Sequence, residues 1–292
     1  MSRSDEKPAA AAKILGAYLR DLRTERGFKI KDVAPEIRAS VSKISRLERG
    51  ESPPRQQDVL DLVRSYGVTS DRDLAEVQEL LRQATAPAWW DQYADVMPGW
   101  LKRLIGLEDS AELLRTYELH TVPGLLQTPD YARAVVRAGL PDIRADLIER
   151  RVSLRRARQQ LLDSESRPSV VALLDESILH RPLGGPEVMV EQLRYLRSLD
   201  RRRGINVRIV PFAASAEVAP PPSSITHLKF AAGGPAEVVY LEQIDSATYL
   251  VKDSEVQTYR YVLDRLSGVA ARRLGSLALL DEAIERFSRQ IS

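Results

Sequence analysis

Residues 40–50 concentrate hydroxyl and guanidinium side chains at a spacing that suits nucleic-acid recognition. If this segment is a helix that turns Ile44 and Leu47 inward, four side chains share the opposite stripe at spacing i, i+3, i+4 and i+7. These are Ser42, Ser45, Arg46 and Arg49. Guanidinium and hydroxyl groups hydrogen-bond to base edges and to phosphate oxygens, but Arg and Ser are also common on solvated helix faces. The stripe alone leaves both interpretations open.

The elements around this stripe are predicted to form an all-α domain of five helices over residues 13–83. Leucines recur at helical spacing before Gly27, where the first helix is expected to end. The second and third helices, of about eight residues each with a three-residue turn between them, have the layout of a helix-turn-helix, whose second helix enters the DNA major groove. The later helices are expected over residues 30–37, 41–49, 59–66 and 71–83.

Positive charge is local in this chain. The 292 residues carry 43 Lys and Arg against 41 Asp and Glu, a net charge of +2. Residues 13–66 alone hold 12 basic against 8 acidic side chains. The nearly neutral total excludes proteins that coat nucleic acid by bulk charge, and the local excess places a basic surface on the predicted helix-turn-helix.

The string S-V-S-K-I-S-R-L-E-R-G at residues 40–50 resembles the recognition helix of the Xre/phage-repressor helix-turn-helix family. Residues 19–27 and the Val33-Ala34 pair fit that family's first two helices. The resemblance implies a structural ion pair between Arg23 and Glu48. It also assigns Val41, Ser42, Ser45 and Arg46 to base-facing positions, and Ser40, Lys43 and Arg49 to positions near the DNA backbone.

Three residues depart from the family pattern. Arg38 replaces the usual turn glycine, and Ile30 occupies a position often held by Thr or Gln. Pro35 falls inside the second helix, where its missing N–H predicts a helix that is bent or begins late. The predicted fold tolerates all three departures.

The larger C-terminal part is predicted to be mixed α/β, which makes the chain α+β overall. A β–α–β unit is expected from two apolar runs that flank a helical segment, followed by a hairpin and a helical tail. Helical signals dominate before it, and Thr128-Pro129-Asp130 marks one helix start. The predicted division is a disordered tail at 1–12, the DNA-binding domain at 13–83, a linker at 84–100 and a sensor or interaction domain at 101–292. The β–α–β unit is expected at 170–174, 186–202 and 207–212, the hairpin at 225–230 and 238–241, and the tail from about 256.

Residues 117–131 and 174–186 resemble the uncharacterised domain that follows this helix-turn-helix in many actinobacterial antitoxin-like regulators. Such proteins are often encoded beside a very small partner protein. The resemblance implies regulation and a protein partner, and it supplies no ligand.

Signals for catalysis or metal binding are weak. Cysteine is absent, and His120, His180 and His227 lie at spacings that match no short metal motif, so no metal site, catalytic residue or cofactor is predicted. The basic stretch at residues 150–158 alternates with apolar residues. An amphipathic helix with a solvated or partner-facing stripe is favoured there over a second nucleic-acid site.

The sequence therefore predicts a cytoplasmic, sequence-specific transcriptional regulator that binds double-stranded DNA. A homodimer is expected because one helix-turn-helix reads only a few base pairs. A protein partner or ligand of the C-terminal domain is expected to modulate operator binding. The alternative is an antitoxin-like interaction protein that mainly sequesters a small partner and autoregulates its operon. A third interpretation, an enzyme localised by its helix-turn-helix, finds no convergent catalytic motif, and no run of apolar residues is long enough to span a membrane.

Overall fold

The chain folds into two compact units, with the boundary between Asp91 and Gln92. As predicted, the architecture is α+β, with helix-turn-helix helices followed by a mixed α/β unit. The computed structural model describes residues 8–50, 52, 54–68, 70–85, 88–164, 167–230 and 237–291.

The first unit consists of α-helices around one apolar core. Leu15 and Leu19 of the first helix and Val59 and Leu62 of the fourth are fully buried in this core. The first helix begins at Pro8, so residues 8–12, predicted as part of a disordered tail, are helical; residues 1–7 lie outside the described residues. The helices are α1 (Pro8–Glu25), α2 (Ile30–Val33), α3 (Val41–Glu48), α4 (Gln56–Ser65) and α5 (Asp71–Ala84).

The second helix is much shorter than predicted. α2 ends at Val33 instead of Ile37, because Pro35 has no N–H to continue the helical hydrogen bonds. The chain then turns, and Arg38 adopts a left-handed conformation with φ of 52°. This is the position at which the family pattern has glycine, the residue that adopts positive φ without steric cost.

A six-stranded sheet in the order β3-β2-β1-β4-β5-β6 forms the centre of the second unit. β1 runs parallel to β2, and β2 to β3, whereas β4, β5 and β6 join in antiparallel pairs. The predicted β–α–β unit and hairpin are confirmed, but β1 and β6 were not predicted. The strands are β1 (Leu113–Glu118), β2 (Ser169–Asp175), β3 (Ile205–Val210), β4 (Ile225–Lys229), β5 (Glu237–Glu242) and β6 (Ala247–Leu250).

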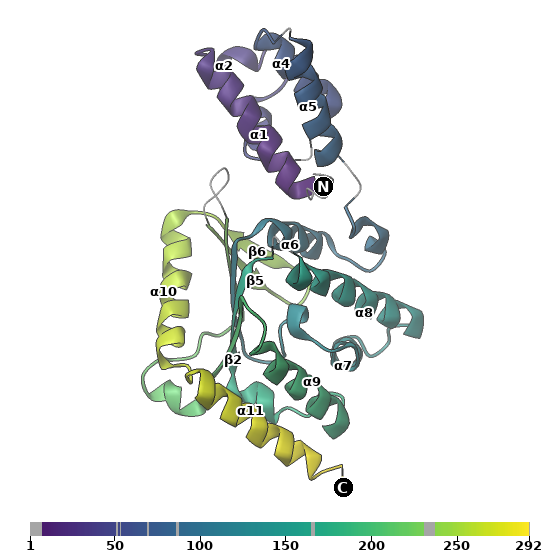
Figure 1. Cartoon of the computed structure of the whole chain (residues 1–292), viewed down its shortest axis with the longest axis vertical. Helices are drawn as coiled ribbons and strands as arrows, with labels where there is room; N and C mark the ends of the chain where they lie inside the picture. Colours follow the sequence, from purple (N-terminus) through teal and green to yellow (C-terminus); the bar gives the residue numbers. More distant parts are fainter. Residues whose placement is uncertain are drawn as a thin grey trace. The chain divides into compact units, whose positions relative to one another are not determined.

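Helices cover both faces of this sheet. α10 lies on one face, over a core that includes Tyr117 and Leu173, and α7, α8 and α9 lie on the other (Figure 1). α11 packs against α9 and β3. The helices are α6 (Gly99–Ser110), α7 (Pro129–Gly139), α8 (Ala145–Gln159), α9 (Pro186–Leu199), α10 (Asp253–Val269) and α11 (Arg273–Ser288).

Short 3₁₀ helices and one N-cap complete the unit. The predicted start of α7 is confirmed, because the Thr128 hydroxyl accepts a hydrogen bond from the Tyr131 N–H at 3.4 Å and Pro129 takes the first helical position. Among the described residues, none of the helices combines the length and the apolar character needed to cross a bilayer. The 3₁₀ helices are Asp91–Tyr93, Gly124–Leu126, Gln160–Asp163, Glu176–His180 and Phe212–Ala216.

Candidate nucleic-acid interface

α3 is a short helix with a well-formed start. The Ser40 hydroxyl accepts a hydrogen bond from the Lys43 N–H at 3.1 Å, which satisfies one of the free donors of the first turn. Ile44 and Leu47 turn into the core of the first unit and are 1% and 6% exposed. The sequence-predicted inner face of this helix is therefore the buried one.

A close backbone approach fixes the distance between α1 and α3. A Cβ atom placed on Gly16 of α1 would lie 2.6 Å from the Leu47 carbonyl oxygen and 2.7 Å from that of Glu48. Only glycine fits such a contact without displacing backbone. Gly16 thus seats the C-terminal end of α3 directly against α1.

Arg23 and Glu48 tie the same two helices together. The Arg23 Nε donates to Glu48 Oε1 at 2.7 Å and Nη2 donates to Oε2 at 2.9 Å, a two-pronged contact between side chains that are 12% and 4% exposed. The pKa of Arg23 is raised by this hydrogen bonding to Glu48. The hydroxyl of the buried Tyr66 also donates to Glu48, at 3.4 Å, a contribution that sequence reasoning missed. A buried pair with additional hydrogen bonds specifies the packing of these helices.

The outward face of α3 carries the residues assigned to base contacts. Val41 is 49% exposed, and Ser42 and Arg46 are also exposed. Ser45 is partly exposed. Arg49, which was assigned to the DNA backbone, is partly exposed beside it, and its Nη1 donates to the Ser45 hydroxyl. The structure thus brings hydroxyl and guanidinium donors together on one accessible surface, whose members are Val41, Ser42, Ser45, Arg46 and Arg49.

The residues assigned to the DNA backbone are more constrained. Ser40 uses its hydroxyl as the helix cap, and the Lys43 Nζ lies 2.7 Å from Asp58 Oδ2 on α4. Lys43 is 39% exposed, so a phosphate would have to compete with Asp58 for its ammonium. The role of Asp58 was not apparent from sequence, because the contact joins residues on two helices whose relative position no local pattern specifies.

We searched the described part of the chain for groups of side chains that could bind a metal ion. No group of three or more His, Asp or Glu side chains there could hold one. The adjacent carboxylates of Asp175 and Glu176 accept hydrogen bonds from groups of the protein itself. Asp175 accepts from the Tyr117 hydroxyl and the Ser177 N–H, and Glu176 accepts from the Phe212 N–H.

Comparisons with known proteins assign each unit separately. Residues 14–77 match a helix-turn-helix domain, and residues 101–282 match the domain of unknown function DUF5753. The chain is 35% identical over 100 residues to the HTH-type transcriptional regulator DdrOP3 of Deinococcus deserti, an alignment that covers 31% of this chain and 77% of that protein. No solved structure matches the chain. Since the DUF5753 match spans more than half of its length, the chain belongs to the DUF5753 family and carries a helix-turn-helix domain ahead of that domain.

Proposed function

We propose that this protein is a DNA-binding transcriptional regulator that places α3 in the major groove. The observation that carries the proposal is the two-sidedness of α3. Its inner face is buried and tied to α1 by Gly16 and the Arg23–Glu48 pair, while Ser42 and Arg46 project from the accessible face. A rigidly seated helix with exposed donors is what direct base readout requires. The helix-turn-helix match and the similarity to a named transcriptional regulator support the same conclusion.

Arg46→Ala tests the base contact. We expect this change to cost roughly 1–3 kcal/mol of specific binding, about 5- to 150-fold in Kd, with little effect on binding to random DNA. The measurement is a fluorescence-anisotropy titration against a footprinted fragment from the region upstream of the gene, at two salt concentrations. Arg82→Ala on α5 is the matched control, because Arg82 is also an exposed arginine and pairs with Glu79. Equal losses on specific and random DNA would show that Arg46 contacts phosphate and not a base.

We further propose that the protein binds DNA as a homodimer. A single recognition helix reads few base pairs, so two copies on half-sites about one helical turn apart supply the specificity. A hydroxyl-radical footprint should then show two protected half-sites related by a twofold axis. A single protected site would contradict the dimer.

The second unit is proposed to bind an effector that alters operator affinity. Family resemblance points to a small partner protein, in which case this chain could act as its antitoxin-like counterpart. The test is to add the product of a small neighbouring gene to the full chain and measure operator Kd. An unchanged Kd at saturation would remove the protein partner from this role.

A further inference from the structure

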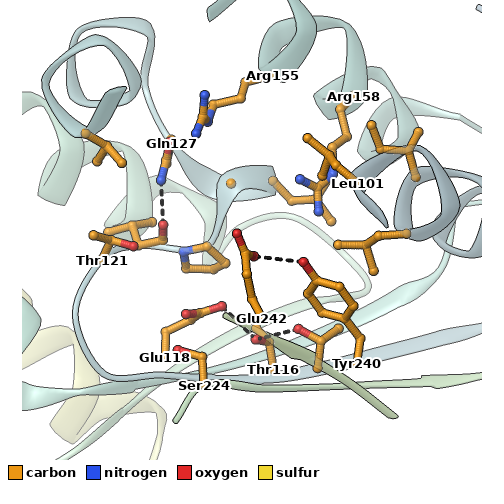
Figure 2. A pocket seen from close by; sticks show the side chains of 18 of the residues that line it. Leu101, Thr116, Glu118, Thr121, Gln127, Arg155, Arg158, Ser224, Tyr240 and Glu242 are labelled. Atoms are coloured by element: carbon orange, nitrogen blue, oxygen red, sulfur yellow. Dashed lines mark hydrogen bonds between the residues drawn. The ribbon is translucent and has the colours of Figure 1, made fainter. Parts of the chain in front are cut away.

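The second unit contains a partly open pocket of about 660 Å³, within the usual range for small-molecule sites. It lies between the sheet face formed by β1, β4 and β5 and a roof formed by α6, α8 and the loop after β1 (Figure 2). A sheet face covered by helices is ordinarily apolar, because buried polar groups cost free energy unless they are paired. This face is polar.

The polar side chains of the sheet form two rows across three strands. The register aligns Thr116, Thr226 and Tyr240. Glu118 at the end of β1, Ser224 just before β4 and Glu242 at the end of β5 line the cavity as a second row. Neighbouring strands lie about 4.8 Å apart, so the two glutamates are anchored roughly 10 Å apart with a serine between them. Figure 2 shows Glu118 close to the strands and the Glu242 carboxylate extending into the cavity towards the Tyr240 hydroxyl.

Hydroxyl groups of the sheet hydrogen-bond to both carboxylates, but no cationic side chain forms an ion pair with either among the described residues. Glu118 accepts from Thr116 at 3.0 Å and also from Ser224, and Glu242 Oε2 accepts from the Tyr240 hydroxyl at 3.0 Å. Burial raises the pKa of Glu118 to about 7, and the nearby charge of Glu242 adds to the shift. A cationic group between the two glutamates would relieve both the burial cost and the repulsion.

The roof carries the opposite charge. Arg151, Arg155 and Arg158 follow one face of α8 at spacing i, i+4 and i+7 and line the cavity, so the predicted solvated or partner-facing stripe is wrong for these three. Arg158 is neutralised by Glu108, to which its Nε donates at 2.6 Å. In contrast, the buried Arg151 Nε has no hydrogen-bond partner within the described ranges.

Arg155 is the second guanidinium on this roof without a hydrogen bond or ion pair to another described residue. Burial, together with the charges of Arg158 and Arg151, lowers the pKa of Arg155 to about 10, although the charge of Glu242 acts in the opposite direction. A guanidinium binds a carboxylate through paired hydrogen bonds, and an anion here would be attracted by both unpaired arginines. The roof therefore fits a carboxylate.

The remaining lining residues would orient a bound ligand. Leu101, Leu104 and Val136 provide apolar wall. Gln127 is 4% exposed, and its Nε2 donates to the Val122 carbonyl at 2.7 Å, while its Oε1 has no partner in the described part of the chain. A buried acceptor without a donor is rare in native proteins and marks a place for a ligand donor or an ordered water.

We propose that this cavity binds a small zwitterion with an apolar body, its carboxylate against Arg151 and Arg155 and its ammonium between Glu118 and Glu242. The charges of sheet and roof complement the two ends of such a molecule, and the leucine-lined wall contacts its middle. This binding involves residues of the second unit alone and does not depend on the proposed DNA contact.

The test is calorimetric titration of the full chain with 6-aminohexanoate, 8-aminooctanoate and 12-aminododecanoate. Octanoate and octylamine serve as single-charge counterparts of the middle probe. We expect at least one amino acid of the series to bind about tenfold more tightly than either single-charge probe. If no member binds more tightly than octanoate and octylamine at concentrations up to about 10 mM, the zwitterion site is wrong.

Variants assign the two ends of the ligand. Arg155→Gln should weaken the amino acid and octanoate by about tenfold while leaving octylamine unchanged, whereas Glu242→Gln should weaken the amino acid and octylamine while leaving octanoate unchanged. Arg156→Gln is the matched control, because Arg156 is an exposed neighbour on α8 outside the cavity lining. Glu242 is solvent-exposed, so Glu242→Gln is expected to fold. If Arg155→Gln fails to fold, Glu242→Gln still tests the proposal. Affinities that no variant alters would overturn the proposal.

Discussion

At the residue scale, Arg38 shows how a departure from a family pattern becomes a local cost. A non-glycine residue in the left-handed region pays about 1 kcal/mol, and Arg38 does so at φ of 52° in the turn that leads to α3. Arg38→Gly should therefore stabilise the first unit by about 1 kcal/mol. Amide hydrogen exchange in α3 measures the change, and Arg20→Gly in the interior of α1 should shift stability by a similar amount in the opposite direction. Faster exchange in the Arg38 variant would contradict the argument.

Glu118 makes the second unit sensitive to pH. Burial raises its pKa from 4.5 to about 7 in the folded state, and Glu242, Arg158 and Tyr131 are the charged or titratable groups that interact with it. Because the folded state holds this proton more tightly, the contribution of Glu118 to stability is intact below pH 4.5 and falls as pH rises to about 7. The total loss is about 3 kcal/mol.

Glu118→Gln tests this dependence. The variant should be more stable than the parent above pH 7, and the difference should vanish towards pH 4.5. Urea unfolding between pH 4.5 and 8 measures it, with the exposed Glu112→Gln as the control. A difference that does not change with pH would show that Glu118 titrates normally.

At the element scale, α3 can pack closely against α1 because Gly16 has no Cβ atom. Ala is ordinarily favoured over Gly in a helix by about 1 kcal/mol, but here its Cβ would meet two backbone carbonyls at under 3 Å. Overpacking costs about 1–3 kcal/mol, so Gly16→Ala should destabilise the first unit and weaken DNA binding by displacing α3. Gly268→Ala in α10 is the control, because its Cβ would meet nothing within 4 Å, and it should be neutral or stabilising. Hydrogen exchange in α1 and α3 reports the difference.

The sequence predicted those elements whose determinants are local. The outward and inward faces of α3, the cap of α7 and the β2–α9–β3 unit all follow from periodicity and capping residues. β1 escaped prediction because Thr116 and Glu118 face the cavity, and their polarity removes the continuous apolar run expected of a central strand. The length of α2 differs from the prediction because Pro35 ends the helix near Val33 instead of bending it. The cavity could not be predicted, since its two polar rows exist only once β1, β4 and β5 are in register.

At the scale of the whole molecule, the local distribution of charge is more informative about function than the net charge. A net charge of +2 conceals a basic surface on the helix-turn-helix and, in the second unit, two buried or partly buried arginines that face two glutamates across a cavity. The first arrangement suits an extended anionic partner and the second a small bipolar one. No residue belongs to both proposed sites. A substitution can therefore remove one site without altering the other.

This independence allows a direct test of whether the cavity controls DNA binding. A ligand can shift operator affinity only by its differential affinity for the DNA-competent state, and a tenfold shift corresponds to about 1.4 kcal/mol. We expect saturating amounts of the tightest amino acid probe to change operator Kd by about tenfold, and operator DNA to change the Kd of the probe by the same factor, because linkage is reciprocal. Anisotropy titrations in both directions measure the two factors. Arg155→Gln should keep operator affinity but lose the response, and Arg46→Ala should lose operator affinity but keep the probe. If the probe saturates the parent chain and operator Kd does not change, the cavity is a binding site without regulatory coupling to the helix-turn-helix.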